Sequence, residues 1–356
     1  MPSTGAFAAS WAGAPLSPFA ITRRPLGPRD VKIAIAYCGV CHSDLHTVRG
    51  EWPGVQFPCV PGHEIVGHVI AIGESVRRHK LGDQVGVGCQ VDSCRGCDSC
   101  KRGLEQYCEN GNTATYNGVD KISGGRTFGG YSSDIVVDEH FVLSIPSALN
   151  LAAAAPLLCA GITCYSPLRH LAAGPGKKVA VVGLGGLGHM GVKLARAMGC
   201  EVLMITTSAS KVADATRLGA HAVAISTNNG ELNRHAATCD VVLDTVAAPH
   251  NLDPYISLLR RDGHLMLLGV PPSRHPSPDV GPLLGHRLSI IGTANGGIAE
   301  TQEMLDFCAE HDIACDIEMI TMNEINGAYE RMLKSDVKYR FVINMRSLPK
   351  PIDENK

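Results

Sequence analysis

Two patterns of apolar and polar residues divide the chain. Between about residues 28 and 146, short apolar runs are separated by turn-forming Gly and Pro residues roughly every ten positions. The clearest runs are Val31–Tyr37, Ile65–Ile72 and Ile135–Val137. Short strands at this spacing are typical of an irregular β-barrel or β-sandwich. A mostly apolar helix is predicted next, over Ala152–Leu171.

From Lys177 onward, short apolar strands alternate with amphipathic helices. Helices are predicted over Leu187–Met198 and Ser210–Leu218. The predicted strands are Lys178–Val182, Val202–Ile205, Asp240–Asp244, Gly263–Leu268 and Leu288–Ile291. Alternation of this kind predicts a doubly wound parallel sheet with helices on both faces.

The C-terminal part carries a helix pattern over Glu300–Glu310 and a strand pattern over Tyr339–Ile343. We expect this part to rejoin the first domain. The predicted organisation is a β domain of residues 1–155 and 296–356, interrupted by a dinucleotide-binding domain of residues 156–295. A length of 356 residues fits two such domains.

Composition narrows the classes of function. The formal net charge of −2 provides no basic surface for nucleic acid, and no apolar run reaches the ~18 residues of a membrane span. The first residues lack a basic leader and a leucine-rich stretch, so we expect a cytoplasmic protein. Four of the 14 cysteines lie between Cys94 and Cys108. In a chain without a signal sequence, this clustering favours metal thiolates over disulfides.

A glycine-rich motif, Gly183-Leu-Gly185-Gly186-Leu187-Gly188, follows a predicted strand and opens a predicted helix. The first glycine permits a tight turn, the second lets the backbone approach a pyrophosphate, and the third allows close packing of helix on strand. The helix N-terminus adds oriented N–H groups and positive potential. A glycine-rich turn without a ligand is the alternative, but the neighbouring strands and helices favour a dinucleotide site.

The end of the second strand of this domain indicates which dinucleotide is bound. A carboxylate there would bind the adenine ribose and select NAD. The segment instead offers hydroxyl groups and one ammonium group, from Thr206, Thr207, Ser208 and Lys211. These groups suit a 2′-phosphate, so the sequence favours NADP(H); an ordinary solvated role for Lys211 is the alternative. Thr163, in the preceding predicted helix, completes the expected cofactor-binding residues.

Four cysteines predict a structural zinc site. Cys94-x-x-Cys97-x-x-Cys100 is followed closely by Cys108. Four thiolates complete the tetrahedral shell of a zinc ion and leave no position for a substrate. The lobe of residues 89–110 is too short to hold a core of its own, so we expect the ion to organise it. Four unrelated buried cysteines are the alternative, and the close spacing argues against it.

A second candidate metal site is formed by residues that are distant in the sequence. Cys41 follows a predicted strand, His63 precedes another, and Cys159 lies near the expected domain junction. A set of two Cys and one His leaves the fourth position of a zinc ion open to water or a substrate oxygen, as catalytic zinc requires. Spacing alone does not connect these residues, and each could singly be a packed thiol or a core histidine.

The chain resembles the zinc-containing medium-chain alcohol dehydrogenases, in particular the cinnamyl alcohol dehydrogenase-type branch with its bacterial broad-specificity aldehyde reductases. The segments that carry the resemblance follow the family order along nearly the whole chain: Gly39–His46, Val60–Gly67, Gly82–Gly86, Cys94–Cys108, Ala155–Gly161, Gly183–Gly191 and Val337–Ile343. The resemblance implies a GroES-like β-barrel catalytic domain with an inserted Rossmann domain. It also implies one catalytic and one structural zinc ion per chain, and a homodimer.

The resemblance further implies roles for individual residues. The catalytic zinc ligands are Cys41, His63 and Cys159. Glu64 is a possible alternate ligand, and Asp44 orients the imidazole of the ligand histidine. Ser43 exchanges the alcohol proton, and His46 is the next member of the proton relay.

The predicted reaction is reversible hydride transfer between NADP(H) and aldehydes or primary alcohols. Plant lignin-pathway members carry a bulky aromatic residue shortly after the fourth structural cysteine, but the segment Glu109–Tyr116 contains no tryptophan. We therefore expect broad specificity for aromatic and aliphatic aldehydes. An NAD-dependent alcohol or polyol dehydrogenase of the same fold is the main alternative. A zinc-free reductase would lack the second metal set, and a non-enzymatic zinc protein would leave the glycine motif and the relay without a purpose.

Overall fold

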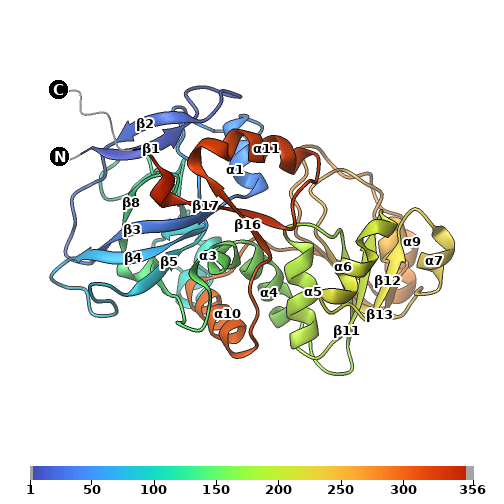
Figure 1. Ribbon diagram of the computed structural model, residues 1–356. Coiled ribbons are helices and arrows are strands. Elements are labelled where there is room, and N and C mark those ends of the chain that lie inside the picture. Colours follow the sequence, from blue (N-terminus) through green and yellow to red (C-terminus); the bar gives the residue numbers. More distant parts are fainter. Residues whose placement is uncertain (1–2, 350–356) are drawn as a thin grey trace. The chain divides into compact units, whose positions relative to one another are not determined.

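The computed structural model describes residues 3–349, and its contacts divide the chain into two compact units (Figure 1). Unit 1 runs to Cys159 and resumes at Gly296, whereas unit 2 comprises Ala160–Asn295. The first boundary lies at Cys159 rather than at the predicted residue 155, and the second lies at the predicted position.

Unit 1 is built around a seven-stranded sheet whose central strand, β3 (Asp30–Gly39), is largely buried. The strand order is β16-β17-β3-β4-β5-β9, and β8 also pairs with β3. The other strands are β4 (Ile65–Ile72), β5 (Gln84–Val87), β8 (Asp134–Asp138), β9 (Leu143–Ser144), β16 (Ile317–Thr321) and β17 (Arg340–Asn344). Two small sheets, β1–β2 and β6–β7, complete the β structure. Their strands are β1 (Thr4–Ala8), β2 (Ser17–Ile21), β6 (Gln90–Asp92) and β7 (Thr113–Ala114).

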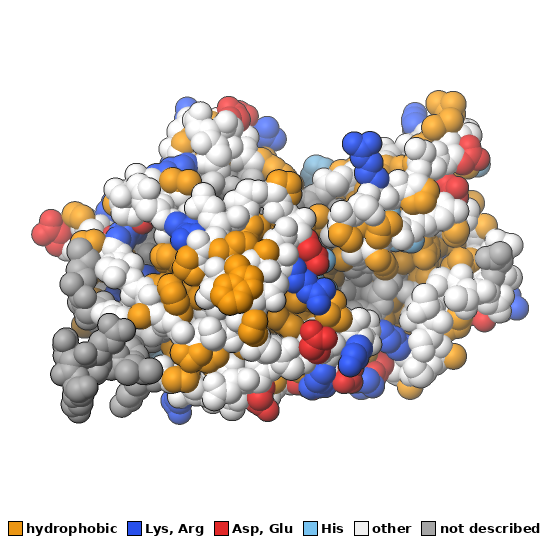
Figure 2. Space-filling view, turned by 90° about the horizontal axis from the view of Figure 1, so that it is seen from above, with side chains coloured by type: hydrophobic (Ala, Val, Ile, Leu, Met, Phe, Trp, Pro, Cys, Tyr) orange, Lys and Arg blue, Asp and Glu red, His pale blue; other side chains and the backbone are white. Residues whose placement is uncertain are grey.

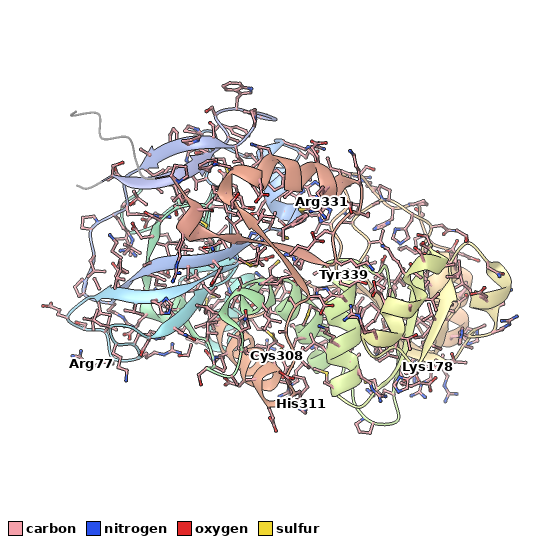
Figure 3. The ribbon with its side chains drawn as sticks, in the orientation of Figure 1. Arg77, Lys178, Cys308, His311, Arg331 and Tyr339 are labelled. Atoms are coloured by element: carbon pink, nitrogen blue, oxygen red, sulfur yellow. The ribbon has the colours of Figure 1, made fainter. Side chains whose placement is uncertain are left out.

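The C-terminal segment adds two strands to the sheet of unit 1. β17 pairs antiparallel with β3 and parallel with β16. Helix α11 (Ile325–Leu333) lies between them in the chain. Its Arg331, labelled in Figure 3, donates to Glu318 of β16 at 2.8 Å and lies 4.7 Å from the centre of the Phe341 ring of β17. The strand pattern of β17 and the helix α10 (Ile298–Glu310) were predicted, whereas β16 and α11 were not.

Unit 2 contains the predicted doubly wound sheet. Its six strands are all parallel, in the order β12-β11-β10-β13-β14-β15. This order is that of a dinucleotide-binding Rossmann domain. The strands are β10 (Lys178–Val182), β11 (Glu201–Thr206), β12 (Ala222–Ile225), β13 (Cys239–Asp244), β14 (Leu259–Leu267) and β15 (Ser289–Gly292). The helices are α4 (Ala160–His170), α5 (Gly188–Ala197), α6 (Val212–Arg217), α7 (Asn229–Asn233), α8 (Asp253–Ile256) and α9 (Val280–His286).

The single helix predicted over Ala152–Leu171 is wrong. The segment forms α3 (Leu151–Ala154), a 3-10 turn (Ala155–Leu158) and α4, with a break at Cys159. Pro156 has no N–H to donate within a helix, and Cys159 has the non-helical angles φ −127° and ψ −68°. The break allows the Cys159 side chain to leave the helical path.

Within residues 3–349, no single helix is both long and apolar enough to cross a membrane. Only the bent pair of helical segments 151–158 and 160–170 together has the required length and apolar composition. On the face shown in Figure 2, Lys and Arg side chains are interspersed with Asp and Glu side chains. That face therefore carries no continuous basic surface of the kind that binds nucleic acid.

Candidate catalytic and cofactor sites

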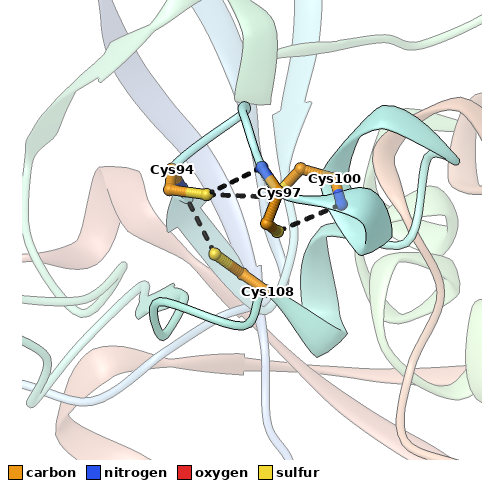
Figure 4. Close-up of side chains that lie close together, drawn as sticks. All are labelled: Cys94, Cys97, Cys100 and Cys108. Carbon is orange, nitrogen blue, oxygen red and sulfur yellow. Dashed lines mark hydrogen bonds between the residues drawn. The ribbon is translucent and has the colours of Figure 1, made fainter.

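The four clustered cysteines lie close together in unit 1 (Figure 4). Their sulfur atoms all lie within 4.8 Å of one another, and the Sγ atoms of Cys94 and Cys100 are 3.9 Å apart. Two Zn–S bonds of about 2.3 Å at the tetrahedral angle place their sulfurs about 3.8 Å apart. The donor set therefore fits a zinc ion with no open position. Cys97 is the N-cap of the short helix α2 (Asp98–Lys101), which also contains Cys100.

Backbone N–H groups donate hydrogen bonds to the sulfur atoms of these cysteines. The N–H of Cys97 donates to Cys94 Sγ, that of Cys100 to Cys97 Sγ, and that of Cys94 to Cys108 Sγ, over 3.3–3.5 Å. Hydrogen bonds from Asn110 and from the backbone of Gly96 and Cys97 lower the pKa of Cys94 to about 5. Donated hydrogen bonds favour the thiolate, the form that binds zinc.

The second metal set is also brought together in unit 1. Ligand atoms of Cys41, His63, Glu64 and Cys159 lie within 4.8 Å of one another, and all four residues are buried. The Sγ atoms of Cys41 and Cys159 are 3.8 Å apart, which is the separation expected for two sulfurs on one zinc ion. Residues 118 positions apart in the sequence therefore meet at one point.

Asp44 holds this set in place from the first turn of α1 (His42–Val48). Its carboxylate is fully buried and accepts three hydrogen bonds: from Cys41 N at 2.9 Å, Gly62 N at 3.0 Å and His63 Nδ1 at 3.1 Å. Because Nδ1 of His63 carries the hydrogen donated to Asp44, Nε2 presents its lone pair as a metal ligand. One carboxylate thus links two of the three predicted ligands.

Glu64 forms a buried ion pair that the sequence analysis missed. One carboxylate oxygen pairs with Arg340 of β17, while Oε2 has no hydrogen-bond partner among the described residues. A Cβ atom at Gly39 would lie 1.9 Å from Oε2, so only glycine leaves room for this carboxylate. Burial raises the pKa of Glu64 to about 8, although the Arg340 guanidinium acts in the opposite direction. The unpartnered carboxylate oxygen is of a donor type that binds metal ions.

The two thiols of this set perturb each other. The hydrogen bond from Cys159 lowers the pKa of Cys41 well below its ordinary value, and the same contact raises that of Cys159. Burial alone would lower the pKa of His63, but the Asp44 carboxylate raises it overall. Cys89, which the sequence analysis did not single out, also lies beside this set, because its thiol contributes to the raised pKa of Cys159. Its position in the sequence gave no signal, since it lies outside the spaced cysteines.

The two predicted relay residues lie one turn apart on α1. Ser43 Oγ is 3.6 Å from Cys41 Sγ, so its hydroxyl group adjoins the metal set. His46 makes no direct hydrogen bond to Ser43; its Nδ1 contacts Glu51 Oε2 at 2.5 Å and its ring stacks on Trp52 at 5.4 Å. Its Nε2 is buried and has no partner among the described residues. Glu51 and Trp52 were not predicted, because they follow the helix and carry no motif.

The glycine motif in unit 2 has the geometry of a dinucleotide fingerprint. Gly183 follows β10 with φ +90°, a conformation that disfavours other residues. A Cβ at Gly188 would lie 1.8 Å from the Gly183 carbonyl oxygen, whereas a Cβ at Gly185 would meet nothing within 4 Å. The third glycine therefore allows close packing, and the second leaves an open approach to the backbone. Thr163 lies on α4, whose next residue, Cys164, donates to Leu187 O of the motif at 3.3 Å.

The end of β11 brings a cation to the same turn. Lys211 Nζ donates to the carbonyl oxygen of Leu184, within the glycine motif, at 2.9 Å. Thr206 is buried, whereas Thr207 is exposed and Ser208 shares a hydrogen bond with Ser210 at 2.7 Å. The nearby carboxylates are engaged elsewhere: Glu201, at the far end of β11, pairs with Lys178 at 3.0 Å, and Asp214 pairs with Arg217 at 3.4 Å.

Two protein families match successive parts of the chain. Residues 27–147 match the alcohol dehydrogenase GroES-like domain, and residues 186–310 match the zinc-binding dehydrogenase family. These matches, with the two units described above, confirm the predicted fold class of a GroES-like domain with an inserted Rossmann domain.

Similar proteins cover nearly the whole chain. The aldehyde reductase YahK of Escherichia coli is 60% identical over 94% of this chain and 96% of its own length. The NADP-dependent alcohol dehydrogenase C 1 of Mycolicibacterium smegmatis is 55% identical over 98% of this chain and 99% of its own. Among solved structures, the cinnamyl alcohol dehydrogenase SbCAD4 of Sorghum bicolor has a TM-score of 0.95 at 43% identity, covering 98% and 100% of the two chains. The Helicobacter pylori enzyme CAD, complexed with NADP(H), has a TM-score of 0.91 at 39% identity, covering 97% and 98%.

Proposed function

The chain belongs to the zinc-dependent medium-chain alcohol dehydrogenases, in the branch of the cinnamyl alcohol dehydrogenases and bacterial aldehyde reductases, and from this we propose that it reduces aldehydes with NADPH and oxidises primary alcohols with NADP⁺. The observation that carries the proposal is the buried Cys41, His63 and Cys159 set with the Ser43 hydroxyl group beside it. Three protein ligands leave one position of a zinc ion for substrate.

The residues of the set fit a catalytic zinc ion in donor type and sulfur separation. When bound, zinc supplies Lewis-acid polarisation of a carbonyl oxygen, and the dihydronicotinamide supplies the hydride. Asp44 keeps His63 in the tautomer that exposes Nε2 and fixes the direction of its ring. Glu64 is held by Arg340, so it acts as an alternate ligand only when that pairing loosens.

The residues of α1 handle the proton. In aldehyde reduction the product oxygen needs one proton, and Ser43 is the hydroxyl group nearest to the ligand set. His46, which lies one turn further along α1, is the next member of the proposed relay, although the two side chains do not hydrogen-bond directly. Ordered donors of this kind accelerate proton transfer because they are positioned before the reaction begins.

The cofactor preference follows from charge at the end of β11. Thr207, Ser208 and Lys211 provide hydroxyl groups and one cation for a 2′-phosphate, and no carboxylate is present from residue 206 to residue 211 to repel it. The hydrogen bond from Lys211 to Leu184 O places its ammonium group beside the turn expected to hold the pyrophosphate. In this proposal, each chain binds two zinc ions, one catalytic and one at the four-cysteine set.

We also propose that the enzyme is a homodimer. β15 ends the sheet of unit 2, and α9, which precedes it in the chain, exposes two apolar side chains, Val280 by 62% and Leu284 by 82%, to a second copy. Sedimentation at equilibrium should give twice the chain mass; a monomer at micromolar concentration would remove this part of the proposal.

A panel of aromatic and aliphatic aldehydes tests the reaction and the cofactor together. Initial rates with NADPH and with NADH, measured in parallel, should show reduction of several aldehydes and a higher kcat/KM with NADPH. Cys159→Ala enzyme purified in the same way controls for contaminating reductases, because it should lose the reaction. A higher kcat/KM with NADH would favour an NAD-dependent dehydrogenase instead, and no reduction of any aldehyde would refute the reaction.

A further inference from the structure

A depression in unit 1 shares no residue with either metal set. Its volume is about 330 Å³, and it is lined by residues of β6 and β8, of the segment 22–25 and of the segment 115–128. Its apolar wall consists of Pro25, Val91, Phe128, Ile135 and Val136. Ligand pockets are typically apolar hollows of about 300–1,000 Å³ with a few polar groups. The depression is therefore a candidate binding site for a small molecule.

Arg126 is a lining residue whose positive charge is not paired. Its guanidinium forms no salt bridge and donates no hydrogen bond to any residue between 3 and 349, and its Nε atom is buried. The guanidinium lies 5.4 Å from the centre of the Phe128 ring, a cation–π contact that orients its plane. Buried N–H donors in native proteins almost always have an acceptor. The free donors of Arg126 therefore favour an acceptor from outside the chain.

The carboxylate that lines the depression, that of Asp120, is engaged by other groups. It accepts from Ile122 N at 2.9 Å, from Ser123 N at 3.3 Å and from Ser123 Oγ at 2.8 Å. Arg24 Nε lies 3.5 Å from the same carboxylate, and the other nitrogens of Arg24 donate to Asp30. Asp120 therefore leaves the unpaired guanidinium of the depression without a counter-charge.

A second guanidinium, that of Arg23, adds positive charge to the same depression. Its hydrogen bonds, over 2.5–3.0 Å, go to the carbonyl oxygens of Phe128, Gly129 and Asp134 and to the hydroxyl group of Ser132. All of these acceptors are neutral, and the carboxylate of Asp134 pairs with Lys32 at 3.4 Å. Burial lowers the pKa of Arg23 to about 10, which still leaves the group charged at neutral pH. The charge of the depression therefore favours an anionic ligand.

We propose that the depression binds a small carboxylate with an apolar body, whose carboxylate group pairs with the guanidinium of Arg126. A guanidinium offers two parallel N–H groups to the two oxygens of a carboxylate, and this charge-assisted pair is stronger than a neutral hydrogen bond. The apolar wall suits the rest of the ligand, and the volume suits an acid with one ring. A phosphate group suits the site less, because it carries about two negative charges and only one lining guanidinium has free donors.

Crystals of the zinc-loaded enzyme soaked with 4-bromobenzoate locate the ligand, because anomalous scattering identifies the bromine atom. Bromine should lie in the depression beside Arg126 in wild type and should be absent from it in Arg126→Gln. Arg102→Gln is the matched control and should bind as wild type does. Arg102 also belongs to unit 1, its side chain is 66% exposed, and its substitution removes the same charge. Bromine found only at the Cys41, His63 and Cys159 set, or not found at all, would overturn the proposal.

Titration of 4-fluorobenzoate into the zinc-loaded enzyme, followed by ¹⁹F NMR, measures the same binding in solution. Arg126→Gln should raise the Kd about 10- to 100-fold, because a charge-assisted pair is lost. Arg126→Lys keeps the charge but not the two parallel donors, so its Kd should lie between those of Arg126→Gln and wild type. Circular dichroism with an unchanged thermal midpoint verifies that each variant is folded. Equal Kd values in wild type and Arg126→Gln would overturn the proposal.

Two further titrations decide between this site and its alternatives. Cys159→Ala should bind 4-fluorobenzoate as wild type does, because the depression contains no ligand of the catalytic metal set. Loss of binding in Cys159→Ala would place the probe at that set and overturn the proposal. Inorganic phosphate should displace the probe only weakly, and displacement by phosphate at a lower concentration than by unlabelled benzoate would overturn the assignment to a carboxylate. None of these measurements depends on aldehyde reduction, so failure of the proposed reaction would leave the test of this site unchanged.

Discussion

Replacing Asp44 by Asn is a sharp perturbation of the catalytic centre, because it exchanges one buried oxygen for an NH₂ group and changes little else. The carboxylate accepts from three donors: Oδ2 from Cys41 N, and Oδ1 from Gly62 N and His63 Nδ1. An amide has one acceptor oxygen and two hydrogens of its own. In its better orientation, the amide oxygen occupies the Oδ1 position, and its NH₂ group then faces the N–H of Cys41.

The expected losses of folding free energy and of zinc affinity follow from this mismatch and from the lost charge. One buried donor left without an acceptor costs about 1–3 kcal/mol of folding free energy. The Asp44 carboxylate also raises the pKa of His63, so its loss makes that imidazole a weaker base and a weaker zinc ligand. Removing such a partner typically weakens metal binding about 10- to 100-fold, which corresponds to about 1.4–2.8 kcal/mol.

Competition between the enzyme and a chromophoric chelator measures this effect directly. Asp44→Asn should release one zinc ion per chain at a 10- to 100-fold lower chelator concentration than wild type, as estimated above. The four-cysteine site is the internal reference, because none of its thiols contacts Asp44, and its ion should be released as in wild type. Asp98→Asn, at a carboxylate 74% exposed, is the control. Release of both ions as in wild type would refute the reasoning, because Asp44 would then not support the metal ligand.

Four other substitutions test the remaining assignments. Cys159→Ala should lose one zinc ion and all activity yet remain folded, whereas Cys97→Ala should damage folding, since binding of a structural zinc ion contributes folding free energy directly. Metal analysis together with circular dichroism checks both predictions, and an active Cys159→Ala enzyme would contradict the proposed zinc ligands. Ser43→Ala should lower turnover about 10²- to 10⁴-fold with both zinc ions retained; wild-type turnover, with chemistry limiting, would argue against its role. Lys211→Ala should raise the KM for NADPH about tenfold or more and barely change that for NADH; an equal rise for both would mean that Lys211 only supports the glycine turn through Leu184.

The sequence predicted the features that depend on local pattern or on dense spacing. The alternation of strands and helices after Lys177 predicted the parallel sheet of unit 2. The three glycines predicted a strand-to-helix turn, and the structure supplies a physical reason for each, from the positive φ of Gly183 to the close contact at Gly188. Spacing alone also indicated the four-cysteine set, because its ligands lie on one short lobe.

Features that depend on distant contacts were not predictable in the same way. The pairing of Arg340 with Glu64 joins residues 276 positions apart, and no local sequence pattern near either residue indicates it. The break at Cys159 was missed because the surrounding alanines and leucines favour a continuous helix, and the tertiary position of the thiol overrides that preference. The contact between Glu51 and His46 was missed for another reason: it arises from a helix-terminating turn, whose glycine is visible in the sequence but whose side-chain contacts are not.

NADPH-dependent aldehyde reduction should require one zinc ion bound at the Cys41, His63 and Cys159 set. Removal of this ion by a mild chelator, followed by stepwise return of zinc, tests that requirement in the intact chain. We predict that one zinc ion per chain remains at the four-cysteine site, that activity falls to zero, and that it returns in proportion to zinc until a second ion per chain is bound. Full activity in enzyme holding a single zinc ion per chain would contradict the account.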